Sequence, residues 1–195
     1  MNEELTNKGI PKVTACLASY NAQDCIEATL ESLALQTYSN FEVLISDDSS
    51  VDETVRICEK FCYSDSRFKL IKQPTRLGWV GNVNALLKLA TGDYFFLMGH
   101  DDILAPSYVY RLVEVLEQNP EAVLAYCDME RIRLNGKKDV LVYSQLNGVK
   151  DRRTRCSKML VQKGFWWVPY RGIFRAYAAA KIGGLKTSKA GEFAA

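Results

Sequence analysis

Residues 13–48 read VTACLASYNAQDCIEATLESLALQTYSNFEVLISDD and hold a complete strand–helix–strand unit. The runs VTACLA (Val13–Ala18) and FEVLI (Phe41–Ile45) are short and largely apolar, which is typical of buried strands. Between them, apolar side chains recur every three to four residues, which predicts a helix over Ala22–Leu35. A strand, a helix and a second strand in this order are the repeating unit of a parallel sheet covered by helices.

The same alternation continues along the chain to about residue 125. The further expected elements are helices over Asp52–Phe61 and Val80–Ala90, strands over Phe68–Ile71 and Tyr94–Met98, a helix opened by Pro106, and a fifth strand that starts within Ala122–Ala125. Four consecutive strand–helix pairs predict an α/β fold with a doubly wound, mostly parallel sheet and right-handed crossovers. Beyond residue 130 the pattern loosens, although Asn135-Gly136 predicts a small β-hairpin and Thr154–Val161 predicts a basic helix.

The composition is that of a single globular domain. The 195 residues are 48% hydrophobic and 25% charged, which excludes a disordered or fibrous chain and provides for a sizeable core. No apolar run approaches the roughly 18 residues that span a bilayer, and the polar N-terminus lacks the apolar region of a secretory signal. A cytoplasmic or peripheral protein with one domain over residues 1–195 is therefore expected, and its six cysteines are expected to be reduced thiols.

The charges divide the chain into an acidic part and a basic part. Residues 1–102 carry 15 acids and 9 bases, whereas residues 103–195 carry 8 acids and 16 bases. The bases concentrate over residues 131–175, either as an ordinary solvated face or as a surface that meets phosphates or the anionic inner face of a membrane. No nucleic-acid-binding motif accompanies them, so nucleic acid is not expected as a partner.

Polar side chains follow three of the expected strands, within residues 18–21, 46–50 and 99–102. Ligands of an open α/β sheet bind outside the carboxyl ends of its strands, so these side chains mark the expected site. Two of the three ends carry paired aspartates, Asp47-Asp48 and Asp101-Asp102, whose mutual repulsion a cation would relieve. Aspartates also cap helices and shape turns, and this alternative stays open for Asp47.

The glycine-rich loops that bind phosphates are missing from the sequence. Neither G-x-G-x-x-G nor G-x-x-x-x-G-K-[ST] occurs, so a dinucleotide fold and a Walker-type phosphate loop are excluded. A diphosphate ligand would then need a cation, and Mg²⁺ and Mn²⁺ are usually held by carboxylates together with substrate phosphates. A phosphoacceptor receiver domain also gathers acids at strand ends, but it needs a lysine after the fifth strand, where Tyr126-Cys127-Asp128 stands instead.

Three segments resemble family 2 glycosyltransferases, whose nucleotide-sugar-binding fold is called GT-A. They are ASYNAQDCIEATLESLALQTYSNFEVLISDDSSVDET, GNVNALLKLATGDYFFLMGHDD and WWVPYRGIFR, and the resemblance extends over roughly residues 11–195. It implies a nucleotide-binding half over residues 11–102 and a partial acceptor half over residues 103–195. The implied activity is metal-assisted transfer of a sugar, with inversion, from a UDP-linked or similar donor to a saccharide, lipid-linked or other hydroxyl acceptor.

The resemblance implies a role for each position that matches the motifs of the family. The nucleotide sugar would be bound by Ala18, Ser19, Tyr20, Asn21, Asp48, Asn82, Asn84 and Asp101. Tyr20 would stack on the base, and Asp48 would accept a hydrogen bond from the imide of a uracil. Asp101 would face the ribose or a metal-bound water, and Asp102 would ligate Mn²⁺ or Mg²⁺. Two alternatives stay open, because Tyr20 could simply pack in the protein and Asn84 could be an ordinary polar residue of a helix face.

The acceptor side is expected in the last third of the chain. Trp166, Trp167 and Tyr170 form either a platform on which an acceptor sugar stacks or part of the core. The implied reaction needs a carboxylate base, and Glu192 is the only late acid. In relatives with a similar GEF segment the base is an aspartate just after it. We therefore expect the true base to lie beyond Ala195, and a nucleotide-sugar-binding module without turnover is the alternative function.

Overall fold

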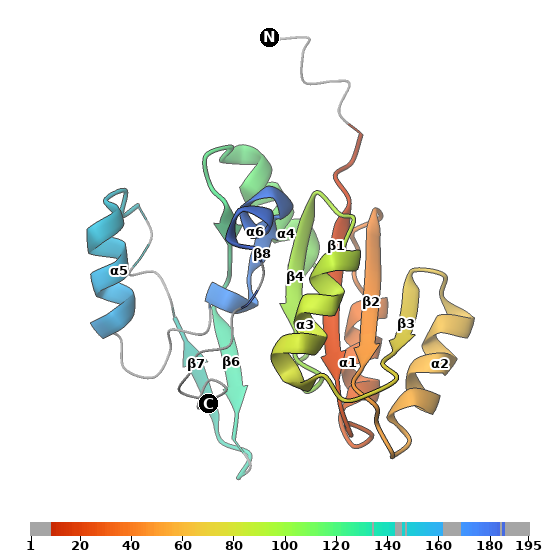
Figure 1. Ribbon diagram of the computed structural model, residues 1–195. Helices are drawn as coiled ribbons and strands as arrows, with labels where there is room; N and C mark the ends of the chain where they lie inside the picture. The colour runs from red at the N-terminus through yellow and green to blue at the C-terminus, as the bar shows by residue number, and fades with distance from the viewer. Residues whose placement is uncertain are drawn as a thin grey trace.

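The computed structural model describes residues 9–133, 135–142, 146, 148–161, 169–183 and 185 (Figure 1). Its elements, in chain order, are β1 (Val13–Ser19), α1 (Ile26–Ala34), β2 (Phe41–Asp47), α2 (Thr54–Ser64), β3 (Phe68–Lys72), α3 (Gly78–Leu89), β4 (Tyr94–Met98), α4 (Tyr108–Gln118), β5 (Leu124–Ala125), β6 (Met129–Ile132), β7 (Lys138–Leu141), α5 (Arg152–Val161), the 3-10 helix η3 (Pro169–Arg171), β8 (Ile173–Arg175) and α6 (Ala176–Ile182). Strands β1 to β4 and helices α1 to α5 overlap the elements expected from the sequence.

Six strands form the main sheet, in the order β3-β2-β1-β4-β8-β5. The strands β3, β2, β1 and β4 are parallel, which confirms the expected parallel sheet, whereas β8 runs antiparallel between β4 and β5. The sequence pattern did not predict β8, because three residues are too few to show the periodicity of a strand. Its Phe174 stacks on Phe95 of β4, with 5.4 Å between the ring centroids.

Helices cover both faces of the sheet because its central strands are apolar on both sides. On one face α1, α2 and α4 pack against side chains such as Leu17 and Ile45. On the other face α3 and the start of α6 pack against side chains such as Leu44 and Leu97. Figure 1 shows α3 in front of the sheet and α1 behind it. The sheet is thus the middle of three layers, and its carboxyl edge is left accessible between them.

Helix α1 begins at Ile26, four residues after the expected start at Ala22. The preceding Cys25 has a φ of −136°, which is outside the helical range. The backbone N–H of Ala22 donates instead to Oγ1 of Thr54 at 2.7 Å, so the turn before α1 is tied to the first residue of α2. The spacing of apolar residues along a helix cannot reveal a contact between segments this far apart in the chain, so the later start of α1 was not predicted.

The hairpin and β8 complete the fold. Gly136 has a φ of +77° at the expected turn between β6 and β7, which confirms the hairpin. Gly172 lies just before β8, where any Cβ would collide with the carbonyl oxygen of Ala125 on β5, so glycine is required for this close approach. Within the described residues, no helix combines the length and the apolar character that a membrane span needs.

Candidate functional site

The carboxyl ends of β1, β2 and β4 meet at one edge of the sheet because these strands are parallel (the lower edge in Figure 1). The backbone N–H of Asp48 donates to the carbonyl oxygen of Ser19 at 2.9 Å, which joins the end of β2 to the end of β1. Ala18 is partly buried there. The loop after β4 carries Asp101 and Asp102, so the polar groups expected to form the site share this edge.

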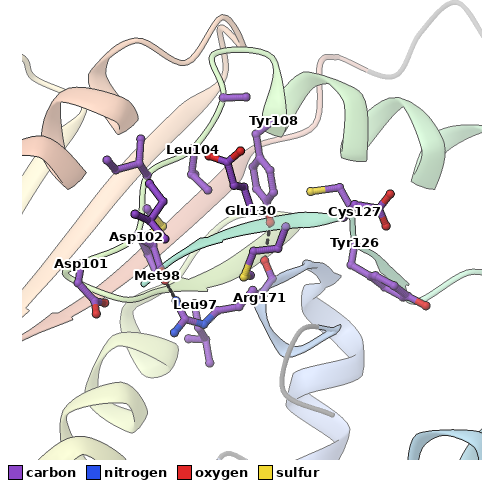
Figure 2. A pocket seen from close by; sticks show the side chains of 15 residues that line it. Leu97, Met98, Asp101, Asp102, Leu104, Tyr108, Tyr126, Cys127, Glu130 and Arg171 are labelled. Atoms are coloured by element: carbon purple, nitrogen blue, oxygen red, sulfur yellow. Dashed lines mark hydrogen bonds and ion pairs between the residues drawn. The ribbon is translucent and has the colours of Figure 1, made fainter. Parts of the chain in front are cut away.

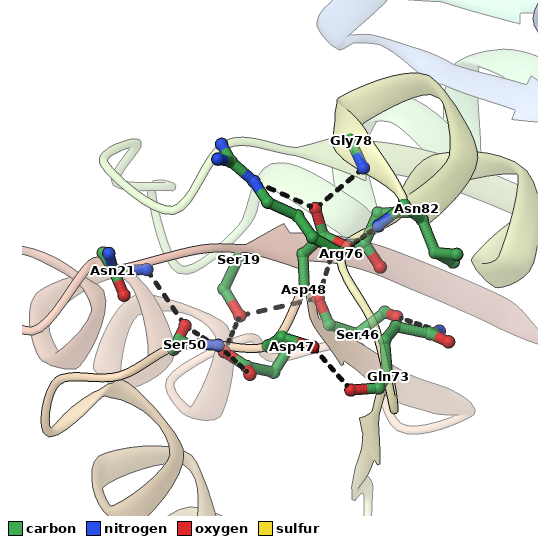
Figure 3. A network of polar contacts seen from close by, with 12 residues as sticks. Ser19, Asn21, Ser46, Asp47, Asp48, Ser50, Gln73, Arg76, Gly78 and Asn82 are labelled. Atoms are coloured by element: carbon green, nitrogen blue, oxygen red, sulfur yellow. Dashed lines mark hydrogen bonds and ion pairs between the residues drawn. The ribbon is translucent and has the colours of Figure 1, made fainter.

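Asp48 is buried at the start of helix α3 (Figure 3). Its Oδ1 accepts the backbone N–H of Leu77 at 2.6 Å, and its Oδ2 accepts that of Gly78 at 3.0 Å. The carboxylate thus caps α3 at the helix end whose N–H dipoles favour a negative charge. Each carboxylate oxygen has two acceptor positions, so the capping bonds leave room for a hydrogen bond from a ligand.

Arg76 covers the ring of Tyr20. The central carbon of its guanidinium lies 3.9 Å from the ring centroid, and its Nε lies 4.0 Å from Oδ2 of Asp48. The cation therefore lies over an aromatic face that was expected to stack on a base, beside the carboxylate expected to bind that base. Nothing in the sequence pattern singles out this arginine, which belongs to the exposed loop before α3.

Two asparagines of α3 have different surroundings. Asn82 is only 2% exposed, and its Nδ2 donates to the carbonyl oxygen of Ser46 at 2.8 Å. Its buried Oδ1 has no hydrogen-bond partner among the described residues, which suits a donor group on a ligand. Asn84 exchanges two hydrogen bonds, of 2.9 and 2.8 Å, with the backbone of Leu185, so both ends of its amide are engaged by the protein itself.

Ser19, Asn21 and Asp47 build the loop that follows β2 (Figure 3). Asp47 accepts hydrogen bonds from the backbone N–H of Ser50 at 2.9 Å, from the Ser50 hydroxyl, and from the Ser19 hydroxyl at 3.4 Å. Asn21 has a φ of +44°, and its Oδ1 accepts the backbone N–H of Val51 at 3.0 Å. Asp47 therefore shapes a turn, the alternative left open for it, and Ser19 and Asn21 hold this turn against the end of β1.

The carboxylates of Asp101 and Asp102 converge on one small space beside Gly99. A Cβ atom built on Gly99 would lie 2.9 Å from Oδ1 of Asp101 and 2.7 Å from Oδ2 of Asp102. Carboxylate oxygens this close repel each other, and such a pair fits a divalent cation. The described residues hold no cluster of three His, Cys, Asp or Glu side chains suited to a metal, so the other ligands would have to be phosphate oxygens and water.

The guanidinium of Arg171 reaches the same space (Figure 2). Its Nη1 would lie 2.8 Å from the Cβ built on Gly99, and it forms an ion pair with Oδ2 of Asp102. Burial lowers the pKa of Arg171 while the nearby charge of Asp101 raises it, and a guanidinium stays protonated under either influence. The positive charge of Arg171 therefore lies beside the two negative charges of Asp101 and Asp102.

The antiparallel strand β8 positions Arg171 beside Asp102. Phe174 of β8 pairs with Phe95 of β4, so the residues just before β8 lie beside the carboxyl end of β4. The hydroxyl of Tyr108 on α4 donates to the carbonyl oxygen of Arg171 and fixes its backbone. Because β8 was not expected from the sequence, the approach of Arg171 to Asp102 was not expected either.

A cavity of about 460 Å³ opens beside the two aspartates (Figure 2). Its walls are the end of β4, the loop of residues 101–105, Tyr108 of α4 and the segment from Tyr126 to Ile132. Its lining is largely apolar, with charges at Asp101, Asp102, Asp128, Glu130 and Arg171. A concave, largely apolar space with a few polar groups is typical of a small-molecule site.

The expected acceptor side is described only in part. The residues that lie outside the described part of the chain are the two tryptophans of the platform, the candidate base and the last residue, which are Trp166, Trp167, Glu192 and Ala195. The expectation that the base lies beyond Ala195 therefore stays a prediction. Tyr170 is half-buried, and its ring lies against Trp79 of α3 with 6.1 Å between the centroids. Burial raises the pKa of the Tyr170 hydroxyl.

Comparison with known proteins places this geometry in a family. A family model described as glycosyl transferase family 2 matches residues 14–177. Among curated relatives, the UDP-Glc:alpha-D-GlcNAc-diphosphoundecaprenol beta-1,3-glucosyltransferase WfaP of Escherichia coli is 38% identical over 105 residues. Those residues are 54% of this chain and 41% of that protein.

Two solved structures have a similar fold. The S. aureus protein TarS 1-349 in complex with UDP matches with a TM-score of 0.70 at 20% identity, over 88% of this chain and 48% of that one. The mannosyltransferase PcManGT from Pyrobaculum calidifontis, in complex with GDP-Man and Mn²⁺, matches with a TM-score of 0.66 at 18% identity. The match covers 92% of this chain and 48% of that one. These likenesses confirm the expected GT-A fold, and the chain spans less than half the length of each of the three proteins. Since the family model matches most of its residues, the chain belongs to glycosyl transferase family 2.

Proposed function

We propose that this chain binds a UDP-linked sugar and takes part in transferring it, with inversion, to a saccharide, lipid-linked or other hydroxyl acceptor. The observation that carries the proposal is the convergence of Asp101 Oδ1 and Asp102 Oδ2 beside Gly99, at the sheet edge that also holds Asp48 and Tyr20. Membership of the family supports transfer chemistry, and the name of the relative WfaP includes UDP-Glc.

The proposed binding site for the uracil base is formed by four side chains, which are Asp48, Tyr20, Asn82 and Arg76. The carboxylate of Asp48 and the orphaned Oδ1 of Asn82 are buried acceptors, and the imide of uracil has one N–H that it could donate to Asp48. The base would stack on the face of the Tyr20 ring that Arg76 does not cover. The guanidinium of Arg76, which lies over that ring, has donors that suit the two carbonyl oxygens flanking the imide.

The proposed reaction centre lies at the carboxylate pair. Asp102, with Asp101, would hold Mn²⁺ or Mg²⁺, which supplies charge stabilisation to a leaving diphosphate. Asp101 and Asp102 line the cavity, so an acceptor in the cavity would meet the donor beside them. The apolar walls of the cavity would keep water away from the reacting hydroxyl.

We propose that this cavity is part of the acceptor site. The aromatic side chains of Trp166, Trp167 and Tyr170 stay a predicted platform for an acceptor sugar. An aromatic ring offers an apolar face against which a sugar can stack. The acceptor hydroxyl must lose its proton to a base, which we propose to be Glu192 or an acid beyond Ala195.

The preference of the protein for one nucleobase over another tests the donor site directly. In calorimetric titrations with saturating Mn²⁺, UDP is expected to bind about 10-fold more tightly than CDP or 3-methyl-UDP, because both analogues lack the imide proton. The wild-type protein suffices, so the result does not depend on the stability of a variant. Equal affinities for the three nucleotides would refute the uridine assignment, and binding of none of them would refute the donor site.

A nucleotide-sugar-binding module without turnover is the second candidate function. It is favoured by the observation that the chain spans less than half the length of the relatives it matches. Donor consumption with a mixture of acceptors separates the two candidates. Acceptor-dependent release of UDP supports the transferase, whereas tight binding of UDP-sugar without release supports the module.

Helix α5 is proposed to bring the protein to the anionic inner face of the cytoplasmic membrane. Exposed basic side chains stand along this helix at Arg152, Arg153, Arg155 and Lys158. Figure 1 shows α5 apart from the central sheet. Each basic residue near an anionic surface contributes about 1 kcal/mol to binding.

Reversing two of these charges is therefore expected to weaken membrane binding. The double variant R152E/R153E should bind phosphatidylserine-rich vesicles at least about 10-fold more weakly than wild type in a sedimentation assay. The matched control reverses Lys60 and Lys88, which are exposed on α2 and α3. Equal sedimentation of wild type and both variants would exclude α5 as the membrane contact.

A further inference from the structure

Arg171 and a divalent cation need the same carboxylate. Oδ1 of Asp101, Oδ2 of Asp102 and Nη1 of Arg171 would all lie within 3 Å of a Cβ built on Gly99, so the three charged groups share one small space. The guanidinium is a permanent positive charge, and it already neutralises part of the negative charge of the pair. A cation placed between these two carboxylate oxygens therefore meets the guanidinium of Arg171 in the same space.

The backbone around Arg171 is fixed, so only its side chain is left to move. Its carbonyl oxygen accepts the hydroxyl of Tyr108, and the preceding Tyr170 packs against Trp79 of α3. The following Gly172 passes too close to β5 for any side chain. A long side chain on a backbone held in this way can exchange one partner for another without a rearrangement of the fold.

The ion pair is partly sheltered from water. The side chains of Arg171 and Asp102 are 28% and 31% exposed, respectively, so their attraction is screened less than that of a pair on the open surface. Breaking the pair without a substitute partner therefore opposes metal binding. A guanidinium binds phosphate oxygens as readily as carboxylate oxygens, because both present two acceptors in a plane that matches its donors.

We propose that Arg171 competes with the divalent cation for Asp102 and transfers to the donor diphosphate when the cation binds. This inference rests on the proposed function, since the new partner of Arg171 is the diphosphate of the nucleotide sugar. The cation alone has to break the ion pair without replacement, whereas the cation with nucleotide gives Arg171 a second anion. Arg171 thereby makes the cation and the nucleotide strengthen each other's binding, and the two effects are equal by linkage.

The test measures Mn²⁺ and UDP separately in Arg171→Met. Free Mn²⁺ is followed by electron paramagnetic resonance without nucleotide, and the dissociation constant of Mn²⁺ is expected to fall about 10-fold, because a charge-assisted bond no longer competes. The dissociation constant of UDP at saturating Mn²⁺ is expected to rise about 10-fold, because the diphosphate loses a charged donor. Arg111→Met is the matched control, since Arg111 on α4 is exposed and pairs with Glu114 at 3.3 Å.

A second variant, Asp102→Asn, tests the inference with Arg171 itself unchanged. Asp102→Asn removes the charge that holds Arg171, so UDP binding in the presence of EDTA is expected to tighten about 3-fold or more. The double variant D102N/R171M should lose this gain, which attributes the gain to Arg171. A structural role for Arg171 alone would leave EDTA-treated UDP binding unchanged in Asp102→Asn.

The outcomes that overturn the inference are specific. Unchanged or weaker Mn²⁺ binding by Arg171→Met without nucleotide overturns the competition, and unchanged UDP affinity at saturating Mn²⁺ overturns the transfer to the diphosphate. Failure of the proposed function looks different, because neither the wild type nor any variant would then bind UDP. The Mn²⁺ measurement contains no nucleotide and decides the competition in either case.

Discussion

Asp102→Asn is expected to abolish the enhancement of UDP binding by Mn²⁺ and to leave the fold intact. The variant keeps the shape of the side chain but removes one of the two charges that converge beside Gly99. A metal held by one or two carboxylates contributes several kcal/mol to the binding of a diphosphate, so the affinity for UDP at saturating Mn²⁺ should fall about 100-fold. Calorimetry with and without Mn²⁺ measures the loss, and thermal unfolding checks the fold.

Asp128→Asn is the matched control for this experiment. Asp128 lines the same cavity but is not among the groups nearest to Gly99, so its removal should leave the Mn²⁺ enhancement within about 2-fold of wild type. An unchanged Mn²⁺ enhancement in Asp102→Asn would show that the cation is held elsewhere. Asp102 would then serve through its ion pair with Arg171 and the hydrogen bond that it accepts from the backbone N–H of Gly99 at 3.3 Å.

Glu42→Gln is expected to lower the free energy of unfolding by about 3 kcal/mol at pH 7. Glu42 is buried on β2, where its carboxylate forms ion pairs with Lys12 at 2.8 Å and Lys69 at 3.1 Å. Burial alone would raise its pKa, but hydrogen bonds from Lys12, Thr14, Lys69 and Thr91 lower the pKa to about 2. At about 1.4 kcal/mol for each pKa unit, the lowering from 4.5 to about 2 gives the expected loss.

The dependence on pH identifies the charge of Glu42 as the cause. Its pKa is lower in the folded than in the unfolded protein, so the stabilisation is complete above pH 4.5 and is lost as the pH falls towards 2. Urea unfolding at pH 7 and pH 3 should show the difference between wild type and variant shrinking by about half. Glu59→Gln, which removes an exposed ion pair with Lys72, is the control and should cost less than about 1 kcal/mol. A difference that is the same at both pH values would rule out an electrostatic origin.

The parallel half of the sheet was predictable because its signals are local. The strands β1, β2 and β4 are short, largely apolar runs, and the helices that follow them repeat their apolar side chains on one face. The strand β4, from Tyr94 to Met98, was predicted with its observed bounds. The strand β8 was not predicted, because three residues gain their extended form from pairing with β4 and β5 rather than from their own pattern.

The candidate site likewise has a part that local sequence signals predicted and a part that they did not. Asp48, Asp101 and Asp102 follow buried strands directly, so the rule for ligands of parallel sheets located them. Arg76 reaches Asp48 from a loop, and Arg171 reaches Asp102 from the residues before β8. Arg171 belongs to a segment that resembles the family, but nothing in the sequence indicated that either arginine contacts an aspartate of this edge. The roles assigned to the aspartates stay predictions, but both arginines show that the negative charge at this edge is already partly balanced by the protein.

The insertion of β8 between β4 and β5 determines the order in which the protein can fold during synthesis. The strands β1 to β4 emerge from the ribosome first, and Tyr94 and Phe95 of β4 stay without their partners on β8 until residues 173–175 have been made. This edge of β4 is apolar along its whole length, so it is a template for pairing with the same strand of another copy. A nascent or proteolysed chain that ends before Ile173 therefore leaves Tyr94 and Phe95 unpaired on this side, and we expect it to aggregate more readily than a chain that retains the residues up to Arg175.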